Sequence, residues 1–190
     1  MNSRLKTPTS EQAAAVLTLA FSADPPTRWL FSDPHDYVTF FPEFVRALGG
    51  RAFEHDTAVS LEGCPAVALW LPPGVRPDEE ALIALIQRTA SGSLLEDAFS
   101  IFEQMAAFDP AEPHWYLPFI GVDPARQGAG YGTELMKHTL QICDADGKPA
   151  YLESSNPRNT AFYERLGFER IGVIQAGAFP RIVPMLRKPR

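Results

Sequence analysis

The order of hydrophobic and polar positions along the chain predicts alternating helices and strands. In the first 110 residues, apolar side chains recur three and four positions apart, which is the spacing of an amphipathic helix. Two short apolar runs flank Glu62-Gly63, which is typical of a β-hairpin. We expect strands over residues 57–61 and 66–71, and helices over 10–21, 34–48 and, in two pieces broken at Ser91-Gly92-Ser93, 78–108.

The first predicted helix has clear start and stop signals. Thr9 or Ser10 followed by Glu11-Gln12 is typical of a capped helix N-terminus. Asp24-Pro25-Pro26 is expected to end this helix and to begin a loop.

The last third of the chain predicts a strand, a glycine-rich turn and a helix. Residues 115–122 are rich in aromatic and β-branched side chains, which indicates a strand that ends at Asp123-Pro124. A helical pattern begins near Gly132 and ends at Asp146-Gly147. We then expect a strand over 150–155, a short helix over 157–166 and a closing hairpin of 168–174 with 181–186. Such alternation predicts an α/β fold.

The glycine-rich turn favours an anion. Gly128, Gly130 and Gly132 alternate, so backbone N–H groups can approach a ligand closely, and the following helix adds a partial positive charge. A nucleotide P-loop requires Gly-Lys-Ser/Thr, and Tyr131 stands where the lysine would be. A dinucleotide-binding turn has the spacing G-x-G-x-x-G, which differs from the G-x-G-x-G found here. Both alternatives are therefore disfavoured.

Two separate blocks of sequence resemble the GNAT family of N-acetyltransferases. The turn resembles the family's acyl-CoA loop through Val122, Pro124, Gln127, Gly130 and Gly132. A second block about 25 residues later resembles the family's Asn-containing turn and short helix through Asn156, Asn159, Ala161, Tyr163, Gly167 and Phe168. From His114 onward the chain is most similar to the puromycin N-acetyltransferases.

The resemblance implies a fold and its organisation. We expect residues 1–190 to form a single domain with the GNAT acyl-CoA N-acyltransferase fold. This fold is a twisted mixed sheet of six or seven strands, splayed at the CoA site, with helices on both faces. The helices of residues 78–108 would wall the acceptor pocket, and residues 114–168 would form the CoA-binding core.

The resemblance also implies acetyl-CoA as the cosubstrate and suggests which residues bind it. The glycine-rich turn would hold the pyrophosphate through backbone N–H groups, and the end of the preceding strand would pair with the pantetheine arm. The expected contacts are Ile120, Gly121, Val122, Gln127, Gly128, Ala129, Gly130, Tyr131, Gly132, Thr133, Asn156, Asn159 and Phe162.

Candidate catalytic groups come from the same comparison. Tyr163 matches the family's proton donor to the CoA sulfur. Some members carry a basic glutamate on the strand before the CoA loop, where Tyr116 stands here, so Glu153, His114 or a water relay remain as candidate bases. Pro118 cannot donate a ladder hydrogen bond, and it marks either a bulge that frees a main-chain N–H for the thioester oxygen or a sheet edge.

Composition narrows the function classes. The 190 residues carry a net charge of −6, which disfavours a nucleic-acid surface and suits a cationic amine. Cys64 and Cys143 have no metal-ligand spacing, and no apolar run is long enough for a membrane span, so we expect no metal and a cytoplasmic location. A small-molecule amine is the expected substrate of a monomer or homodimer. The alternatives are a peptide amine, or an acyl-CoA-binding regulatory module with little turnover.

Overall fold

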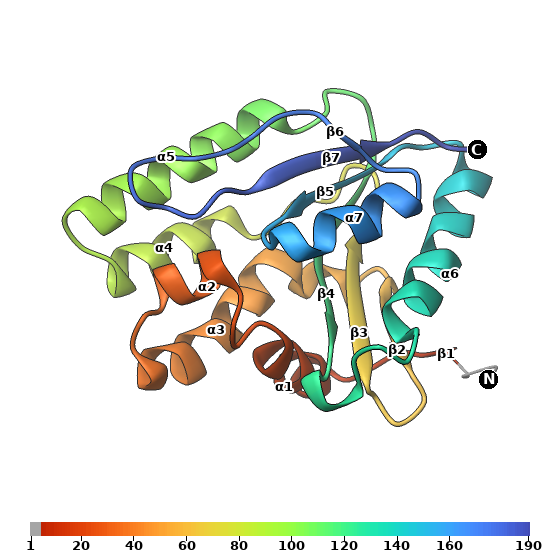
Figure 1. Ribbon diagram of the computed structural model, residues 1–190, viewed down its shortest axis with the longest axis horizontal. Coiled ribbons are helices and arrows are strands. Elements are labelled where there is room, and N and C mark those ends of the chain that lie inside the picture. Colours follow the sequence, from red (N-terminus) through yellow and green to blue (C-terminus); the bar gives the residue numbers. More distant parts are fainter. Residues whose placement is uncertain (1–4) are drawn as a thin grey trace.

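The computed structural model describes residues 5–190, in which seven strands form a mixed sheet with helices on both faces (Figure 1). The strands lie across the sheet in the order β1-β2-β3-β4-β5-β7-β6. They are β1 (Leu5–Lys6), β2 (Ala58–Leu61), β3 (Ala66–Leu71), β4 (Trp115–Val122), β5 (Ala150–Ser154), β6 (Glu169–Arg170) and β7 (Val183–Arg187). The predicted α/β class and strand number are confirmed.

The helices lie close to their predicted positions, with one addition. They are α1 (Ser10–Ala20), α2 (Pro25–Leu30), α3 (Pro34–Gly49), α4 (Glu79–Thr89), α5 (Ser93–Phe108), α6 (Tyr131–Asp146) and α7 (Pro157–Arg165). Single 3₁₀ turns occupy Gly50–Ala52 and Pro124–Arg126. Thr9 and Gln12 form the reciprocal hydrogen bonds of a capping box at the start of α1, as their spacing predicts.

The addition is α2, where the expected loop is wrong. Asp24 is the N-cap of this helix, and its carboxylate accepts a hydrogen bond from the backbone N–H of Thr27 at 3.2 Å. Pro25 and Pro26 occupy the first helical turn, where a missing N–H costs no intrahelical hydrogen bond. Asp-Pro-Pro therefore begins a helix here.

The central strands β4 and β5 are parallel and separate after a short contact. Trp115 pairs with Ala150 and Tyr116 with Tyr151, and across residues 5–190 no further pairing joins these two strands. β4 nevertheless continues to Val122. The sheet is thus splayed between the carboxyl ends of β4 and β5, as predicted.

A bulge beside Pro118 shifts the register of β4 against β3 and so changes which side chains of β4 point to each face of the sheet. Leu69 pairs with Phe119 but Leu71 pairs with Tyr116, so β4 has one residue more than β3 over this interval. Tyr116 and Phe119 consequently pack against the same core although they are three residues apart. The predicted bulge is confirmed, and the alternative of a sheet edge is wrong because β4 lies between β3 and β5.

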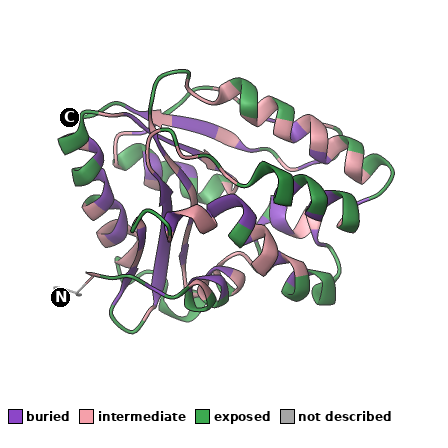
Figure 2. Ribbon diagram, turned by 180° about the vertical axis from the view of Figure 1, so that it is seen from behind, coloured by how far each residue is buried: buried purple, intermediate pink, exposed green. Residues whose placement is uncertain are grey.

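Both faces of the sheet are covered. Val67 and Leu69 of β3 pack in the core that contains residues of α1 and α3, whereas Ala68 and Trp70 pack in the core that contains residues of α6 and α7. All six residues of β3 are buried, so the central strands form the interior of the molecule (Figure 2). A continuous apolar run is what a strand covered on both faces requires.

The predicted closing hairpin is shorter than expected. β6 has two residues, and a single bridge joins Ile174 to Ile182 before β7 begins. The segment between β6 and β7 runs along α5 instead (Figure 1). Gln104 donates to the carbonyl of Gln175 at 2.9 Å and accepts from its N–H at 3.1 Å, so side-chain contacts to α5 replace the expected strand ladder.

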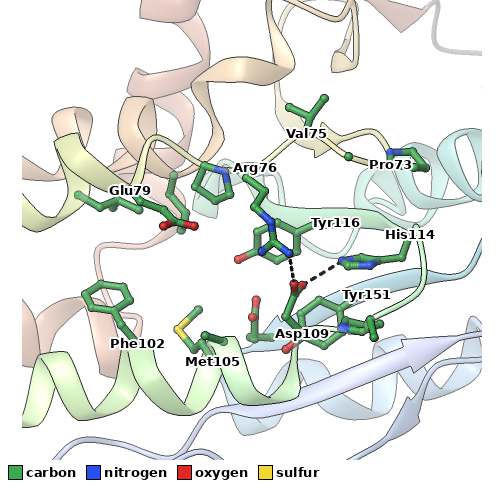
Figure 3. Close-up of a pocket in the computed structure, with 18 of the residues that line it drawn as sticks. Pro73, Val75, Arg76, Glu79, Phe102, Met105, Asp109, His114, Tyr116 and Tyr151 are labelled. Atoms are coloured by element: carbon green, nitrogen blue, oxygen red, sulfur yellow. Dashed lines mark ion pairs between the residues drawn. The ribbon is translucent and has the colours of Figure 1, made fainter.

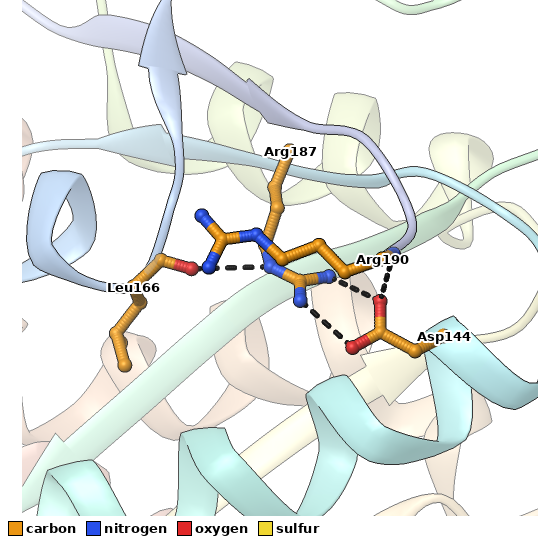
Figure 4. A network of polar contacts seen from close by, with 4 residues as sticks. All are labelled: Asp144, Leu166, Arg187 and Arg190. Atoms are coloured by element: carbon orange, nitrogen blue, oxygen red, sulfur yellow. Dashed lines mark hydrogen bonds and ion pairs between the residues drawn. The ribbon is translucent and has the colours of Figure 1, made fainter.

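The chain end is attached to the rest of the fold by a buried arginine (Figure 4). The guanidinium of Arg187 on β7 donates two hydrogen bonds, of 2.7 and 2.8 Å, to the carboxylate of Asp144 on α6. Its Nε donates to the carbonyl of Leu166 at 3.1 Å, and the backbone N–H of Arg190 donates to the same carboxylate. These bonds join α6, the end of α7 and the last strand.

Candidate active site

The splay between β4 and β5 contains a cavity of about 120 Å³, which we call the splay cavity. Its wall is built from the two strands, α5, α7 and the junction of α1 and α2. Polar or backbone groups reach it from Pro118, Ile120, Glu153, Ser155, Asn159, Tyr163 and Asp24. Residues from the first and last thirds of the chain therefore meet at the point where the sheet opens.

The glycine-rich turn fits an anion through its backbone. Gly128 and Gly130 have φ of +80° and +87°, and an added Cβ at either would meet nothing within 4 Å, so the left-handed backbone explains the glycines. Gln127 donates to the carbonyl of Val122 at 3.3 Å and closes the turn. Gly130 is the N-cap of α6 and offers no side chain to the first-turn N–H groups. The backbone N–H groups of Tyr131, Gly132 and Thr133 are therefore available to an acceptor from outside the helix.

The other predicted cofactor contacts lie on or next to β4, α6 and α7, and two of them line the splay cavity. Ile120 and Asn159 line the splay cavity, and a Cβ on Gly132 would lie 3.7 Å from Phe162. The Asn156 side chain caps α7, because its amide oxygen accepts a hydrogen bond of 3.0 Å from the backbone N–H of Arg158. Ala129 lies within the turn itself.

Gly121 has a packing reason for being glycine. A Cβ at this position would lie 2.7 Å from the Cβ of Ala20 and 2.8 Å from a methyl group of Leu17. Both of these residues belong to α1, so the glycine allows α1 to approach β4 closely.

Tyr163 projects from α7 into the splay cavity and is 7% exposed. Burial raises the pKa of its phenol above the ordinary value, and the nearby carboxylate of Asp24 raises this pKa further. The hydroxyl therefore stays protonated at neutral pH and is able to donate a proton.

Glu153 is the predicted base candidate that lies at the cleft. It lines both the splay cavity and a larger neighbouring cavity. Burial raises the pKa of its carboxyl group to about 7, although the hydroxyls of Tyr116 and Tyr151 beside it favour the ionised form. Because this pKa is close to neutral, the carboxylate can accept and release a proton under physiological conditions.

His114 lies on the wall of the larger cavity (Figure 3). Its Nε2 is 3.1 Å from a carboxylate oxygen of Asp109, whose other oxygen is 2.8 Å from the guanidinium of Arg76. Its Nδ1 is 2.9 Å from the carbonyl oxygen of Glu112. Since both ring nitrogens face acceptors, neither is turned toward the cavity to take a proton. The ring packs edge-on against Tyr151.

The larger cavity has a volume of about 670 Å³, and we call it the outer cavity. It lies beneath α4 and α5 and shares Tyr116, Glu153, Phe102 and Met105 with the splay cavity, so the two adjoin. Figure 3 shows Phe102 and Met105 facing it from α5. Cavities of this size hold small organic ligands.

Two functional candidates were not predicted from the sequence. The carboxylate of Asp24 lies 2.6 Å from the hydroxyl of Ser155, across the cleft from the first helices to the end of β5. Asp24 is 7% exposed, and burial raises its pKa. The Asp-Pro-Pro sequence was a signal for this capping carboxylate, but its contact with Ser155 joins positions 131 residues apart.

Among residues 5–190, no group of three or more His, Cys, Asp or Glu side chains is arranged to hold a metal ion. None of the helices in the described part of the chain is long and apolar enough to cross a membrane.

Comparison with known proteins gives a family. Residues 69–168 match the acetyltransferase (GNAT) family. An uncharacterised N-acetyltransferase of Schizosaccharomyces pombe is 46% identical over 54 residues, which are 28% of this chain and 22% of the yeast protein. This match thus spans about a fifth of the relative's length.

Solved structures share the fold over nearly the whole chain. A crystal structure of histone acetyltransferase HPA2 and related acetyltransferase from Corynebacterium glutamicum has a TM-score of 0.70 and 21% identity to this chain, and the match covers 100% of this chain and 98% of that one. A mosquito arylalkylamine N-acetyltransferase like 5b has a TM-score of 0.66 and 14% identity, covering 97% and 99%.

The family match covers more than half of the chain and includes the splayed strands, the glycine-rich turn and the helix of Tyr163. The chain belongs to the acetyltransferase (GNAT) family.

Proposed function

We propose that the protein transfers an acetyl group from acetyl-CoA to a primary amine of a small molecule by direct attack. The observation that carries this proposal is the meeting of Glu153 and Tyr163 in the splay cavity. One group has a pKa near 7 and the other is a neutral phenol, so the cleft holds a proton acceptor and a proton donor together.

The turn and the open edge of β4 would hold the cosubstrate. The unpaired first-turn N–H groups of α6 suit the pyrophosphate, and the part of β4 beyond Tyr116 has a free edge toward β5 for the pantetheine arm. The bulge beside Pro118 alters the main-chain direction at Phe119, where a backbone N–H would bind the thioester oxygen.

The chemistry then divides between two residues. Glu153 accepts a proton from the ammonium group, and the freed nitrogen lone pair attacks the thioester carbon. The C–N bond forms and the C–S bond breaks as Tyr163 gives its proton to the sulfur. The nitrogen returns a proton to the tyrosinate, and Glu153 releases its proton to solvent. The products are the N-acetyl amide and free CoA.

We assign the base to Glu153 rather than to His114. Glu153 lines both cavities, whereas His114 lines only the outer cavity. The nitrogens of His114 already face Asp109 and the carbonyl of Glu112. We propose that His114 instead holds the segment before β4 against Tyr151. A water relay from Glu153 is compatible with the same assignment.

The small-molecule acceptor is supported by the volume of the outer cavity and by a structural neighbour whose name specifies an arylalkylamine. A peptide amine is the alternative acceptor. The closer similarity to puromycin N-acetyltransferases stays a prediction.

The test has two parts. Calorimetry should detect acetyl-CoA binding that is tighter than ATP binding, and a panel of primary amines should release free CoA with formation of the N-acetyl product. Binding of acetyl-CoA without product from any amine would favour a regulatory acyl-CoA-binding module. Absence of acetyl-CoA binding would remove the proposal altogether.

A further inference from the structure

A buried hydroxyl without a partner lies at the inner end of the outer cavity. Tyr151 is 1% exposed, and its hydroxyl makes no hydrogen bond to any residue between 5 and 190. An unpaired buried hydroxyl is costly, and in a native protein it calls for an explanation. Glu153 lies beside this hydroxyl without forming a hydrogen bond to it, and Tyr151 lines the outer cavity, so a ligand bound in this cavity can supply the missing partner.

Three oxygen-bearing side chains, of Tyr116, Tyr151 and Glu153, line this end of the cavity. The β4–β5 pairing places Tyr116 opposite Tyr151, and their rings are 5.8 Å apart. Glu153 follows Tyr151 by two residues on β5 and therefore points to the same side of the sheet. The hydroxyls of Tyr116 and Tyr151 lie near the Glu153 carboxyl group and favour its ionised form (Figure 3 shows the two tyrosines). A primary ammonium has three N–H donors, which matches one carboxylate and two phenol oxygens.

The remaining wall of the outer cavity is mainly apolar. Leu48, Val75, Leu82, Ile83, Phe99, Phe102 and Met105 contribute to it. The charged lining side chains away from Glu153 are either paired or exposed. Asp109 is paired with Arg76 and His114, while Glu79, Glu103 and Glu112 are exposed, so water and salt weaken their attraction for a cation.

We infer that the outer cavity selects a primary amine on an uncharged, apolar skeleton, with the ammonium held by Glu153, Tyr116 and Tyr151. The inference rests on the proposed acetyl transfer and narrows its substrate class. A carboxylate next to the amine would lie against Glu153, and a second cation would lose its water among apolar side chains. A methyl group on the nitrogen would remove one of the three donors.

A matched series of amines tests the selection. Phenethylamine, N-methylphenethylamine, phenylalanine and agmatine are compared by kcat/KM for CoA release. We expect phenethylamine to exceed each of the others by about tenfold or more, because each change leaves a buried polar group unpaired or brings a second charge into the cavity. An equal or higher kcat/KM for agmatine or phenylalanine would overturn the inference while leaving acetyl transfer intact. Failure of every amine would count against the proposed function instead.

Tyr151→Phe tests the seat itself and keeps the volume of the side chain. We expect KM for phenethylamine to rise about tenfold, the loss of one hydrogen bond to a charged group, with acetyl-CoA affinity unchanged. Tyr37→Phe is the matched control, because Tyr37 is buried as well and its hydroxyl donates to the carbonyl of Thr18, but the side chain lies outside both cavities. If both variants left KM unchanged, or raised it equally, Tyr151 would have no role in the amine seat.

Discussion

Glu153 has the pKa and the position that proton acceptance requires. Burial places its carboxyl pKa near 7, and two tyrosine hydroxyls keep the ionised form accessible. Because the folded pKa is raised, ionisation of Glu153 opposes folding, and its contribution to stability falls as pH rises from about 5 through 7. A position that is costly for a charge is common at catalytic sites.

Tyr163→Phe tests the proton donor. We expect kcat to fall by about a hundredfold or more, because the thiolate would leave without a proton from the enzyme. Acetyl-CoA affinity and the melting temperature should stay near those of the wild type, since the ring remains in place between Phe162 and Phe168. Steady-state kinetics and calorimetry measure the two quantities. Full turnover in this variant would show that another group protonates the sulfur.

Single residues were predicted where a motif fixes their place. Tyr163 and Glu153, which belong to one short block of sequence, line the splay cavity, and Asn156 of the same block caps α7. Asp24, Ser155 and Tyr151 were not predicted, because their importance arises from contacts between distant segments or from an unpaired hydroxyl. The spacing of hydrophobic and polar residues along the chain predicts neither such contacts nor an unpaired hydroxyl.

At the scale of elements, the glycine-rich turn depends on backbone conformation. Gly130→Ala should destabilise the fold by about 1–2 kcal/mol through its left-handed φ and weaken acetyl-CoA binding by about tenfold as the N–H groups shift. Gly63→Ala is the control, since Gly63 has φ +77° in the hairpin turn between β2 and β3 with equally open surroundings.

Denaturation and calorimetry distinguish these two effects. Both variants should lose similar unfolding free energy, while only Gly130→Ala should lose acetyl-CoA affinity. Unchanged affinity in Gly130→Ala would mean that the turn does not seat the cosubstrate.

Elements were predictable where caps and periodicity agree. Thr9 and Gln12 mark the start of α1, and Gly147 ends α6 in a left-handed conformation. β1 has two residues and depends on pairing with β2, so it carries no pattern of its own. β6 is short for a related reason, because Gln104 of α5 binds the chain that would have extended it.

At the scale of the whole molecule, the Arg187–Asp144 pair fastens the last strand. The Arg187 side chain is 5% exposed, so Asp144→Ala would leave a buried charge unpaired and should lower the unfolding free energy by about 3 kcal/mol. Glu164→Ala is the control, because it breaks an ion pair with Arg170 that is exposed and should cost about 1 kcal/mol or less. Equal losses in urea denaturation would contradict a structural role for the buried pair.

This pair also has a pH signature. Hydrogen bonds from Arg187 hold the pKa of Asp144 below its ordinary value. Its stabilisation is therefore present above the pKa of an unfolded aspartate and is lost as pH falls through the lower folded value. At neutral pH, the unfolding free energy of Asp144→Ala should be lower than that of the wild type. Below about pH 4, the ordinary pKa of aspartate, the unfolding free energy of the variant should fall less steeply with pH than that of the wild type.

The rate of acetyl transfer by Glu153→Gln is the most direct test of the proposed activity. With phenethylamine or the best amine found, wild-type kcat/KM should rise with pH through about 7 and then level off, as the pKa of Glu153 requires. Glu153→Gln should bind acetyl-CoA as the wild type does but transfer acetyl groups about a hundredfold more slowly, without that pH dependence. Wild-type turnover in Glu153→Gln, with the same pH profile, would contradict the assignment.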